Sequence, residues 1–133
     1  MRVFIAEDSI LISERVADLL GHIQGLELVG QAANVPAAAL AIKQLNPDAV
    51  ILDLRMPGGS GLDLLVALKK QSPTIIVIVF TALSSPEMRR RCTESGANFF
   101  LDKSQDFEEL PSILKVLTEK SQHVLPAKPA RHP

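Results

Sequence analysis

The sequence contains no tryptophan, no tyrosine and only one cysteine. Without Trp or Tyr, we do not expect an aromatic platform on which nucleic-acid bases could stack. The single cysteine, Cys92, cannot form an internal disulfide. It fits a reducing compartment, and we expect it to be a small residue within a helix.

Long apolar segments are also missing. The longest run, residues 75–80, is far too short to span a bilayer. No charged segment leads into an apolar one at the N-terminus, as a signal peptide would require. We therefore expect a cytoplasmic chain that does not contact a membrane.

Neither sign of charge dominates. The formal net charge is −1, so no general attraction to nucleic acid or anionic lipid is expected, and we predict no nucleic-acid binding by this chain alone. Hydrophobic residues make up 47% of the 133 residues and charged residues 22%, which is typical of a globular domain. This length suits one domain with a substantial core.

Apolar runs and helical patterns alternate along the chain. The pattern predicts strands at residues 3–6, 26–32, 48–54, 74–80 and 98–101, and helices at residues 10–23, 35–45, 62–71, after Ser84-Ser85-Pro86, and at 106–120. This alternation predicts an α/β fold, with a five-stranded parallel sheet and helices on both faces. Residues 122–133 are rich in proline, and we expect an extended, loosely held tail or the start of an interdomain linker.

Chemically active side chains follow four of the five expected strands. The first ends in Glu7 and Asp8, the third in Asp53 and the fourth in Thr81, and Lys103 follows the fifth closely. Ligands of open parallel sheets bind beyond the carboxyl ends of the strands, so these groups should meet at one edge. Clustered carboxylates are explained by a hard cation, and Mg²⁺ suits them best because it takes one or two carboxylates together with waters and phosphate oxygens. The competing interpretation, that Glu7 and Asp8 are solvated residues before a helix capped by Ser9, explains either residue alone but not the whole set.

Four motifs carry a resemblance to a known family. They are "AEDS" (6–9), "DLRMPGGSG" (53–61), "VFTA" (79–82) and "FFLDKS" (99–104). In this order and at these intervals, the chain resembles the receiver domain of bacterial two-component response regulators over residues 1–121. The resemblance implies the flavodoxin-like, CheY-like sheet of strand order 2-1-3-4-5.

The resemblance also implies residue roles. Asp53 would be the phospho-acceptor, with Glu7, Asp8, Asp53 and the backbone carbonyl of Arg55 as Mg²⁺ ligands. Thr81 and Lys103 would contact the phosphoryl oxygens, and Thr81 would act with Phe100 as the switch. These roles suit the chemistry, because a carboxylate can form an acyl phosphate while positioning and charge neutralisation supply most of the catalysis. Small residues at Gly58, Gly59 and Gly61 would let the loop approach Asp53 closely.

The function implied is a phosphorylation-dependent signalling switch. Its partner would be a sensor histidine kinase, a phosphotransfer protein or a small phosphodonor, and phosphorylation could drive formation of a homodimer. The chain would not be an enzyme in its own right, but a phospho-acceptor that assists its own phosphorylation and dephosphorylation. We expect the receiver part of a transcriptional regulator. A stand-alone regulator acting through protein–protein contacts is the alternative.

Some positions depart from the commonest pattern of the family. Ser104 follows Lys103 where many receivers have proline, which leaves the backbone after Lys103 open. The Lys-Ser pair and the stretch "HIQGLELVGQAANVPAAALA" resemble receivers that precede a LuxR-type helix-turn-helix.

Two other classes use similar residues or the same fold. An aspartyl-phosphate phosphatase of the haloacid-dehalogenase type needs a second aspartate two residues after the nucleophile, and Arg55 occupies that position. A flavodoxin-like FMN carrier needs a phosphate-binding loop after the first strand, where Glu7 and Asp8 would repel the phosphate. Both therefore fit this sequence less well than a receiver does.

Overall fold

The computed structural model describes the backbone of residues 1–130 and the side chains of residues 1–121. Five parallel strands form one sheet in the order β2-β1-β3-β4-β5, which confirms the expected topology. The strands are β1 (Arg2–Ala6), β2 (Glu27–Ala32), β3 (Ala49–Leu52), β4 (Ile76–Thr81) and β5 (Phe99–Asp102). The helices between and after them are α1 (Ile10–Gly21), α2 (Val35–Leu45), α3 (Gly61–Gln71), α4 (Pro86–Glu94) and α5 (Glu109–Ala130).

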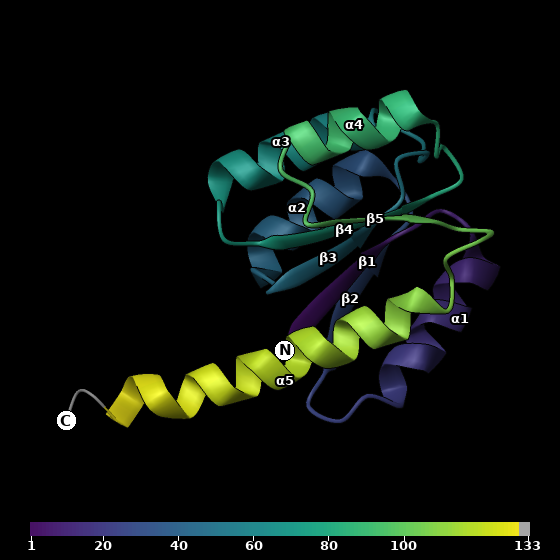
Figure 1. Cartoon of the computed structure of the whole chain (residues 1–133). Helices are drawn as coiled ribbons and strands as arrows, with labels where there is room; N and C mark the ends of the chain where they lie inside the picture. Colours follow the sequence, from purple (N-terminus) through teal and green to yellow (C-terminus); the bar gives the residue numbers. More distant parts are fainter. Residues whose placement is uncertain (131–133) are drawn as a thin grey trace.

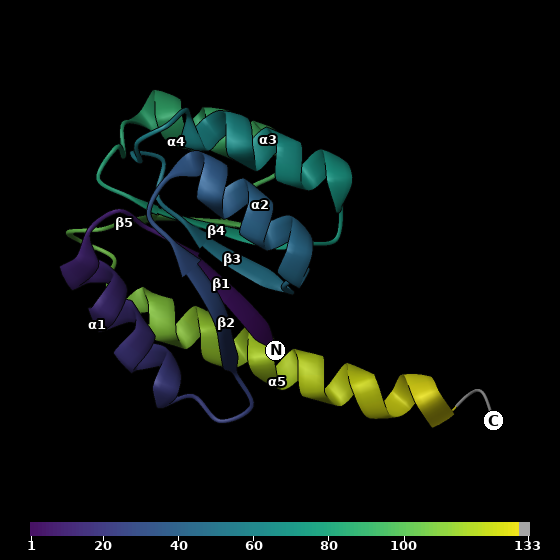
Figure 2. The ribbon, with the colours of Figure 1, turned by 180° about the vertical axis from the view of Figure 1, so that it is seen from behind.

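The sheet lies between two layers of helices (Figure 1), and the view from behind shows the same arrangement (Figure 2). Helices α2, α3 and α4 cover one face, and α1 and α5 cover the other. Both faces are therefore buried, which explains why the central strands read as continuous apolar runs rather than as alternating patterns.

The side-chain alternation of each strand divides the core into two clusters. In β1, Phe4 and Ala6 pack with the first layer of helices, whereas Val3 and Ile5 pack against α1 and α5. All four side chains are almost completely buried. A shift of one residue would exchange the two sets, so the core fixes which side chains follow each strand at the edge of the sheet.

Short polar side chains start four of the helices. Each cap accepts a hydrogen bond from a backbone N–H in the first turn; the caps are Ser9, Asn34, Ser60 and Ser85. These bonds satisfy donors that have no partner within the helix. The cap expected at Ser9 is confirmed, and the helices begin directly after the loops that carry the strand-end residues.

The end of the chain differs from the sequence prediction. Helix α5 begins at Glu109 rather than at residue 106, because Asp106 closes a turn in which its N–H donates to the carbonyl of Asp102 (2.8 Å). The helix then continues to Ala130, so the extended backbone predicted from residue 122 is wrong as far as residue 130. The prediction treats the prolines of this segment as breaks, because a proline inside a helix removes one N–H donor and costs about 3 kcal/mol. The local residue preferences do not explain the helical backbone here. Residues 131–133 of the predicted tail lie outside the described residues.

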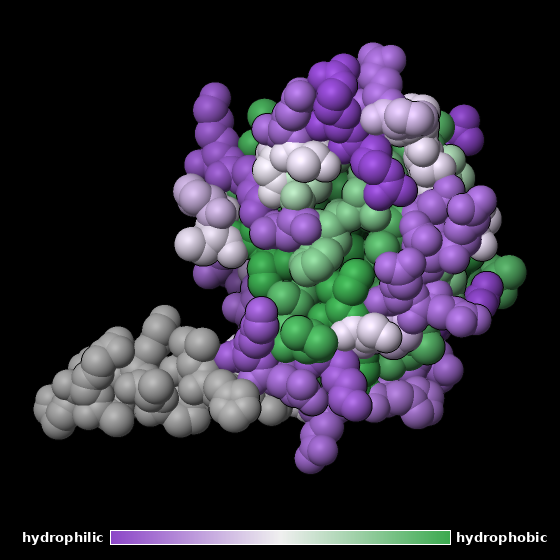
Figure 3. All heavy atoms as spheres, viewed as in Figure 1, coloured by the Kyte–Doolittle hydropathy of each residue, from purple (hydrophilic) through white to green (hydrophobic). Residues whose placement is uncertain are grey.

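Within the described part of the chain, no helix combines the length and the apolar character that crossing a membrane requires. On the face viewed in Figure 3, hydrophobic side chains gather at the centre, between the upper helices and α5. Charged and polar side chains surround this apolar area.

Candidate functional site

Backbone hydrogen bonds fix three of the strand-end residues just beyond the sheet. The N–H of Glu7 donates to the carbonyl of Ala32 (3.0 Å), that of Asp53 to Ala6 (2.9 Å) and that of Lys103 to Thr81 (3.0 Å). The hydrogen-bonding ladder thus runs one residue past the ends of β1, β3 and β5. Side chains from distant parts of the sequence are held at one edge by the regular geometry of the sheet.

The ammonium group of Lys103 joins the two buried carboxylates. Its Nζ lies 2.7 Å from Oε1 of Glu7 and 2.9 Å from Oδ2 of Asp53. The carboxylate side chains are only 3% exposed and the lysine side chain 17%, so solvent screens these contacts weakly. Lys103 is therefore the counter-ion that allows two negative charges to stay beside the core.

Burial and ion pairing shift the pKa values in this group. Burial raises the pKa of Glu7 above its usual value, although hydrogen bonds from Lys103 and from the N–H of Ser9 oppose this shift. Burial alone would lower the pKa of Lys103, but its hydrogen bonds to Glu7 and Asp53 and their negative charges together raise it. The lysine therefore stays charged, and Glu7 holds a proton more readily than an exposed glutamate would.

Three carboxylates surround one point at this edge. One oxygen each from Glu7, Asp8 and Asp53 lies within 4.8 Å of the other two. Glu7 and Asp53 are buried and Asp8 is exposed, so the cluster opens to solvent on the Asp8 side. An all-oxygen donor set with an open side fits Mg²⁺, which keeps several waters and needs few protein ligands.

The loop after β3 is built closely around Asp53. The N–H of Arg55 donates to Oδ1 of Asp53 (3.1 Å), which leaves Oδ2 to the lysine. A Cβ atom on Gly61 would lie 2.5 Å from Cα of Leu54 and 2.9 Å from the carbonyl oxygen of Asp53. The sequence prediction that a glycine permits close approach here is confirmed at Gly61 by these distances.

Gly58, in the same loop, lies at a position that requires glycine. It has φ +87°, which favours glycine, and a Cβ there would meet Pro36 at 2.7 Å. The N–H of Val35 donates to the carbonyl of Pro57 (2.9 Å), so the loop is tied to the start of α2.

Thr81 is the last residue of β4 and is completely buried. Its hydroxyl oxygen accepts a hydrogen bond from the N–H of Leu83 (3.1 Å), which folds the loop back onto it. Its hydroxyl proton is not needed for this bond and can be donated to another acceptor.

Phe99 and Phe100 point to opposite faces of β5. Phe100 is 9% exposed and packs with the cluster beneath α2, α3 and α4, whereas Phe99 packs with the cluster beneath α1 and α5. Arg89 of α4 covers the Phe100 ring, with its guanidinium carbon 4.6 Å from the ring centroid, which is within the range typical of cation–π contacts. Its Nη1 also donates to the carbonyl of Phe100 (3.2 Å). In this structure, Phe100 lies inward beneath an arginine.

Sequence reasoning missed one set of polar contacts beside the site. The carboxylate of Asp102 accepts hydrogen bonds from the hydroxyls of Ser84 and Ser104 and from the N–H groups of Ser104 and Gln105. An aspartate directly before a lysine gives no sequence signal for a contact with Ser84, 18 residues away. Only the pairing of β4 with β5 brings them together.

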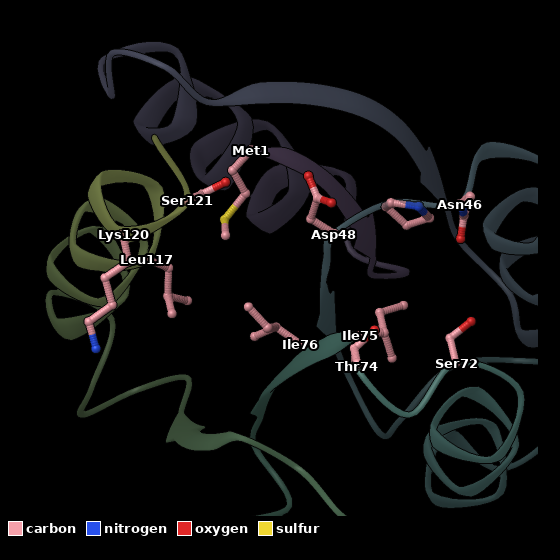
Figure 4. Close-up of a pocket in the computed structure, with 11 residues that line it drawn as sticks. Met1, Asn46, Asp48, Ser72, Thr74, Ile75, Ile76, Leu117, Lys120 and Ser121 are labelled. Atoms are coloured by element: carbon pink, nitrogen blue, oxygen red, sulfur yellow. The ribbon is translucent and has the colours of Figure 1, made fainter. Parts of the chain in front are cut away.

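A pocket of about 580 Å³ lies at the opposite edge of the sheet, where the strands begin (Figure 4). Met1, Ile76, Leu117 and Lys120 are among its lining residues. The carboxylate of Asp48, the acidic residue of this pocket, accepts a hydrogen bond from the backbone N–H of Arg2 (2.8 Å) and so holds the start of β1 in place. The group of reactive side chains therefore lies at the other edge, around Asp53.

Comparisons with known proteins agree with this geometry. The family model described as the response regulator receiver domain matches residues 3–115. The uncharacterized transcriptional regulatory protein YvfU of Bacillus subtilis is 32% identical over 115 residues, which are 86% of this chain and 58% of that protein. The chain thus spans less than two thirds of YvfU.

Solved receiver structures share the whole fold. The receiver domain of the putative response regulator NarL from Mycobacterium tuberculosis is 28% identical with a TM-score of 0.80, covering 89% of this chain and 95% of that one. The isolated REC domain of RcsB from Salmonella enterica, solved with phosphomimetic BeF₃⁻, is 25% identical with a TM-score of 0.83, covering 90% and 88%. The match over 113 consecutive residues, the strand order and the acidic edge lead to one conclusion: the chain belongs to the response regulator receiver domain family.

Proposed function

We propose that this chain is a phosphorylation-dependent signalling switch that accepts a phosphoryl group on Asp53. The observation that carries this proposal is the pairing of Asp53 with Lys103 (2.9 Å) at the edge where Glu7 and Asp8 also lie. A carboxylate in this position is both a nucleophile and a group whose charge is already partly neutralised.

In the reaction, an oxygen of Asp53 attacks the phosphorus of the donor. A P–O bond forms to Asp53 while the bond to the leaving group breaks, at nitrogen for a phosphohistidine or at oxygen for acetyl phosphate. Lys103 stays charged and faces the carboxylate, so it can follow the negative charge onto the phosphoryl oxygens.

Glu7, Asp8 and Asp53, with the backbone carbonyl of Arg55, would hold Mg²⁺. When bound, the ion supplies charge neutralisation to the phosphoryl oxygens. The start of α3 packs closely against the backbone of Asp53 and Leu54, because Gly61 has no side chain to separate them.

Thr81 and Phe100 would convert the chemical change into a structural one. A phosphoryl group adds acceptor oxygens beside Thr81, whose hydroxyl proton can be donated to them. A shift of Thr81 would carry the loop bonded to it through Leu83. Phe100 could then exchange the cover of Arg89 for a different packing, and so alter the surface of α4, β5 and α5.

The relatives indicate the setting of such a switch. YvfU is named a transcriptional regulatory protein, and we propose that this chain is the receiver part of a similar regulator, with residues 1–121 as the receiver domain and the following residues as a tail or linker. A sensor histidine kinase or phosphotransfer protein would be the donor, and phosphorylation would promote a homodimer. We further propose that the chain acts in the cytoplasm, as a phospho-acceptor rather than as an enzyme with a separate substrate.

Beryllofluoride, which mimics a phosphoryl group, tests the proposal without any kinase. We expect ¹⁹F NMR to show a bound species that requires Mg²⁺ and is absent in Asp53→Asn. Asp63→Asn is the matched control, because Asp63 is an exposed carboxylate on α3 away from the cluster. Equal binding by wild type and Asp53→Asn would contradict the proposal.

A further inference from the structure

Asp102 links the turn that carries Lys103 to the loop that follows Thr81. It is the last residue of β5, directly before Lys103, and it pairs in register with Thr81 of β4. We propose that Asp102 is a positioning residue. It holds the Cα of Lys103 and the loop after Thr81 in the geometry needed to phosphorylate Asp53, and this inference rests on the proposed function.

One carboxylate oxygen of Asp102 holds the backbone that follows Lys103. Oδ1 accepts hydrogen bonds from the N–H of Ser104 (2.8 Å), from its hydroxyl (2.7 Å) and from the N–H of Gln105 (3.3 Å). The sequence left this backbone open, because serine stands where many receivers have proline. In this chain, the aspartate one residue before the lysine supplies the restraint.

The backbone of Asp102 completes a closed turn. Its N–H donates to Oδ2 of Asp106 (2.9 Å), and its carbonyl accepts from the N–H of Asp106 (2.8 Å). Lys103 therefore leaves a turn that is held on both sides. A lysine side chain is a flexible chain of four methylene groups. Its ammonium can therefore stay between Glu7 and Asp53 only if the Cα of Lys103 is held in place.

The other oxygen of Asp102 reaches the neighbouring loop. Oδ2 accepts from the hydroxyl of Ser84, which lies between β4 and α4. The N–H of Leu83, one residue earlier, donates to the hydroxyl of Thr81. The bond from Ser84 therefore holds the loop whose Leu83 N–H is bonded to the Thr81 hydroxyl. The carboxylate of Asp102 thus restrains the backbone next to both Thr81 and Lys103, the two residues that would contact the phosphoryl oxygens.

Asp102 acts in its ionised form. The hydrogen bonds from Ser84 and from Ser104 lower its pKa to about 2. It therefore accepts these bonds as a carboxylate throughout the physiological range, and bonds to a charged acceptor are the stronger kind.

The rate at which acetyl phosphate labels Asp53 tests the inference. We expect Asp102→Ala to lower the maximal rate about 10-fold, with a smaller change in the half-saturating concentration, because Lys103 meets charge that develops during transfer. Ser84→Ala should cost less, since it removes one bond, and Asp102→Asn should recover part of the loss. Glu108→Gln is the control: it removes an exposed carboxylate nearby that accepts no hydrogen bond from any residue the structure describes.

A second measurement separates positioning from general stability. In NMR spectra, the side-chain ammonium of Lys103 should shift and broaden in Asp102→Ala but not in Glu108→Gln. A wild-type labelling rate in Asp102→Ala would overturn the inference. If Asp102→Ala does not fold, wild-type rates in both Ser84→Ala and Asp102→Asn would overturn it instead.

The same design distinguishes the two proposals. If wild type is not labelled at all, the proposed function fails. The position of the Lys103 ammonium in the variants then decides the structural part of the inference, and an unchanged Lys103 signal in Asp102→Ala overturns it. If wild type is labelled and only the variant rates are unaffected, the inference alone fails.

Discussion

Lys103 and Asp53 lie 50 residues apart in the sequence, and their charged groups meet at 2.9 Å beyond the carboxyl ends of β5 and β3. The same ammonium contacts Glu7, so one positive charge serves two buried negative charges. Among the side chains described at this site, Lys103 carries the one positive charge, beside the three carboxylates of Glu7, Asp8 and Asp53. It follows that changes at Lys103 should affect both stability and chemistry.

Removing this ammonium should destabilise the fold in a pH-dependent way. In Lys103→Met, two buried carboxylates face each other without a counter-ion, and we expect a loss of about 3 kcal/mol at neutral pH in the absence of divalent cations. Burial raises the pKa of Glu7 in the folded state, so its contribution to stability is full below the unfolded value of 4.5 and is lost as the pH rises through the folded value. Loss of the lysine should enlarge this effect.

Urea unfolding between pH 4 and 8 measures the prediction. The difference between wild type and Lys103→Met should grow as the pH rises, and Mg²⁺ should reduce it. The matched control is Lys115→Met, on an exposed position of α5. A difference that stays constant across this range would mean that the carboxylates do not depend on Lys103.

Magnesium binding should depend on the three clustered carboxylates. Asp8→Asn and Asp53→Asn each remove one charge from a group whose oxygens lie within 4.8 Å, so we expect affinity to fall at least about 10-fold. Asp63→Asn should bind as wild type does. Because the chain has no Trp or Tyr, calorimetry or NMR is the suitable measurement. Unchanged affinity in both cluster variants would place the ion elsewhere.

Gly61→Ala should damage both fold and site. The added Cβ would lie 2.5 Å from Cα of Leu54, which is backbone and cannot rotate away, so we expect a loss of about 1–3 kcal/mol. Gly21→Ala is the control, since a Cβ at that helical position meets nothing within 4 Å and should be neutral or slightly stabilising. Urea unfolding compares the two, and equal stabilities would show that the loop moves freely.

The regular part of the fold followed from the sequence. The alternating pattern predicted all five strands and five helices, because apolar runs and helical periodicity reflect burial that the structure confirms. The edge at which Glu7, Asp53 and Lys103 meet was also predictable, since parallel strands bring their carboxyl ends together.

The parts that could not be predicted depend on contacts between loops. The hydrogen bond from Ser84 to Asp102 joins short polar residues in two loops, and residues of this kind occur in any loop. The cover of Arg89 over Phe100 joins a helix to a strand, where the sequence shows only a run of three arginines. The continuation of α5 to Ala130 was missed because its prolines were interpreted as stopping the helix.

Thr81 should couple phosphorylation to the face formed by α4, β5 and α5. Thr81→Ala removes the hydroxyl that would donate to the phosphoryl group but leaves Asp53 and the clustered carboxylates in place. Beryllofluoride should therefore still bind at Asp53, while its effect on this face should be lost. In wild type, we expect amide shift changes over residues 85–120 and stronger self-association. A population shift of this kind needs a difference of only a few kcal/mol between two states.

The matched control is Thr93→Ala on α4, whose hydroxyl donates to the carbonyl of Arg89 within the same helix (2.9 Å). This variant should respond as wild type does. Shift changes confined to α1 and α2 would show that the signal leaves the site by another route.

The site of covalent labelling tests the central claim most directly. Wild type, Asp53→Asn and Asp63→Asn are incubated with acetyl phosphate and Mg²⁺, and the modified residue is located by mass spectrometry after borohydride reduction of the acyl phosphate. The account predicts one hydroxylamine-labile phosphoryl group on Asp53 in wild type and Asp63→Asn, and none in Asp53→Asn. A phosphoryl group found on Ser60 or Thr81, or labelling that persists in Asp53→Asn, would contradict it.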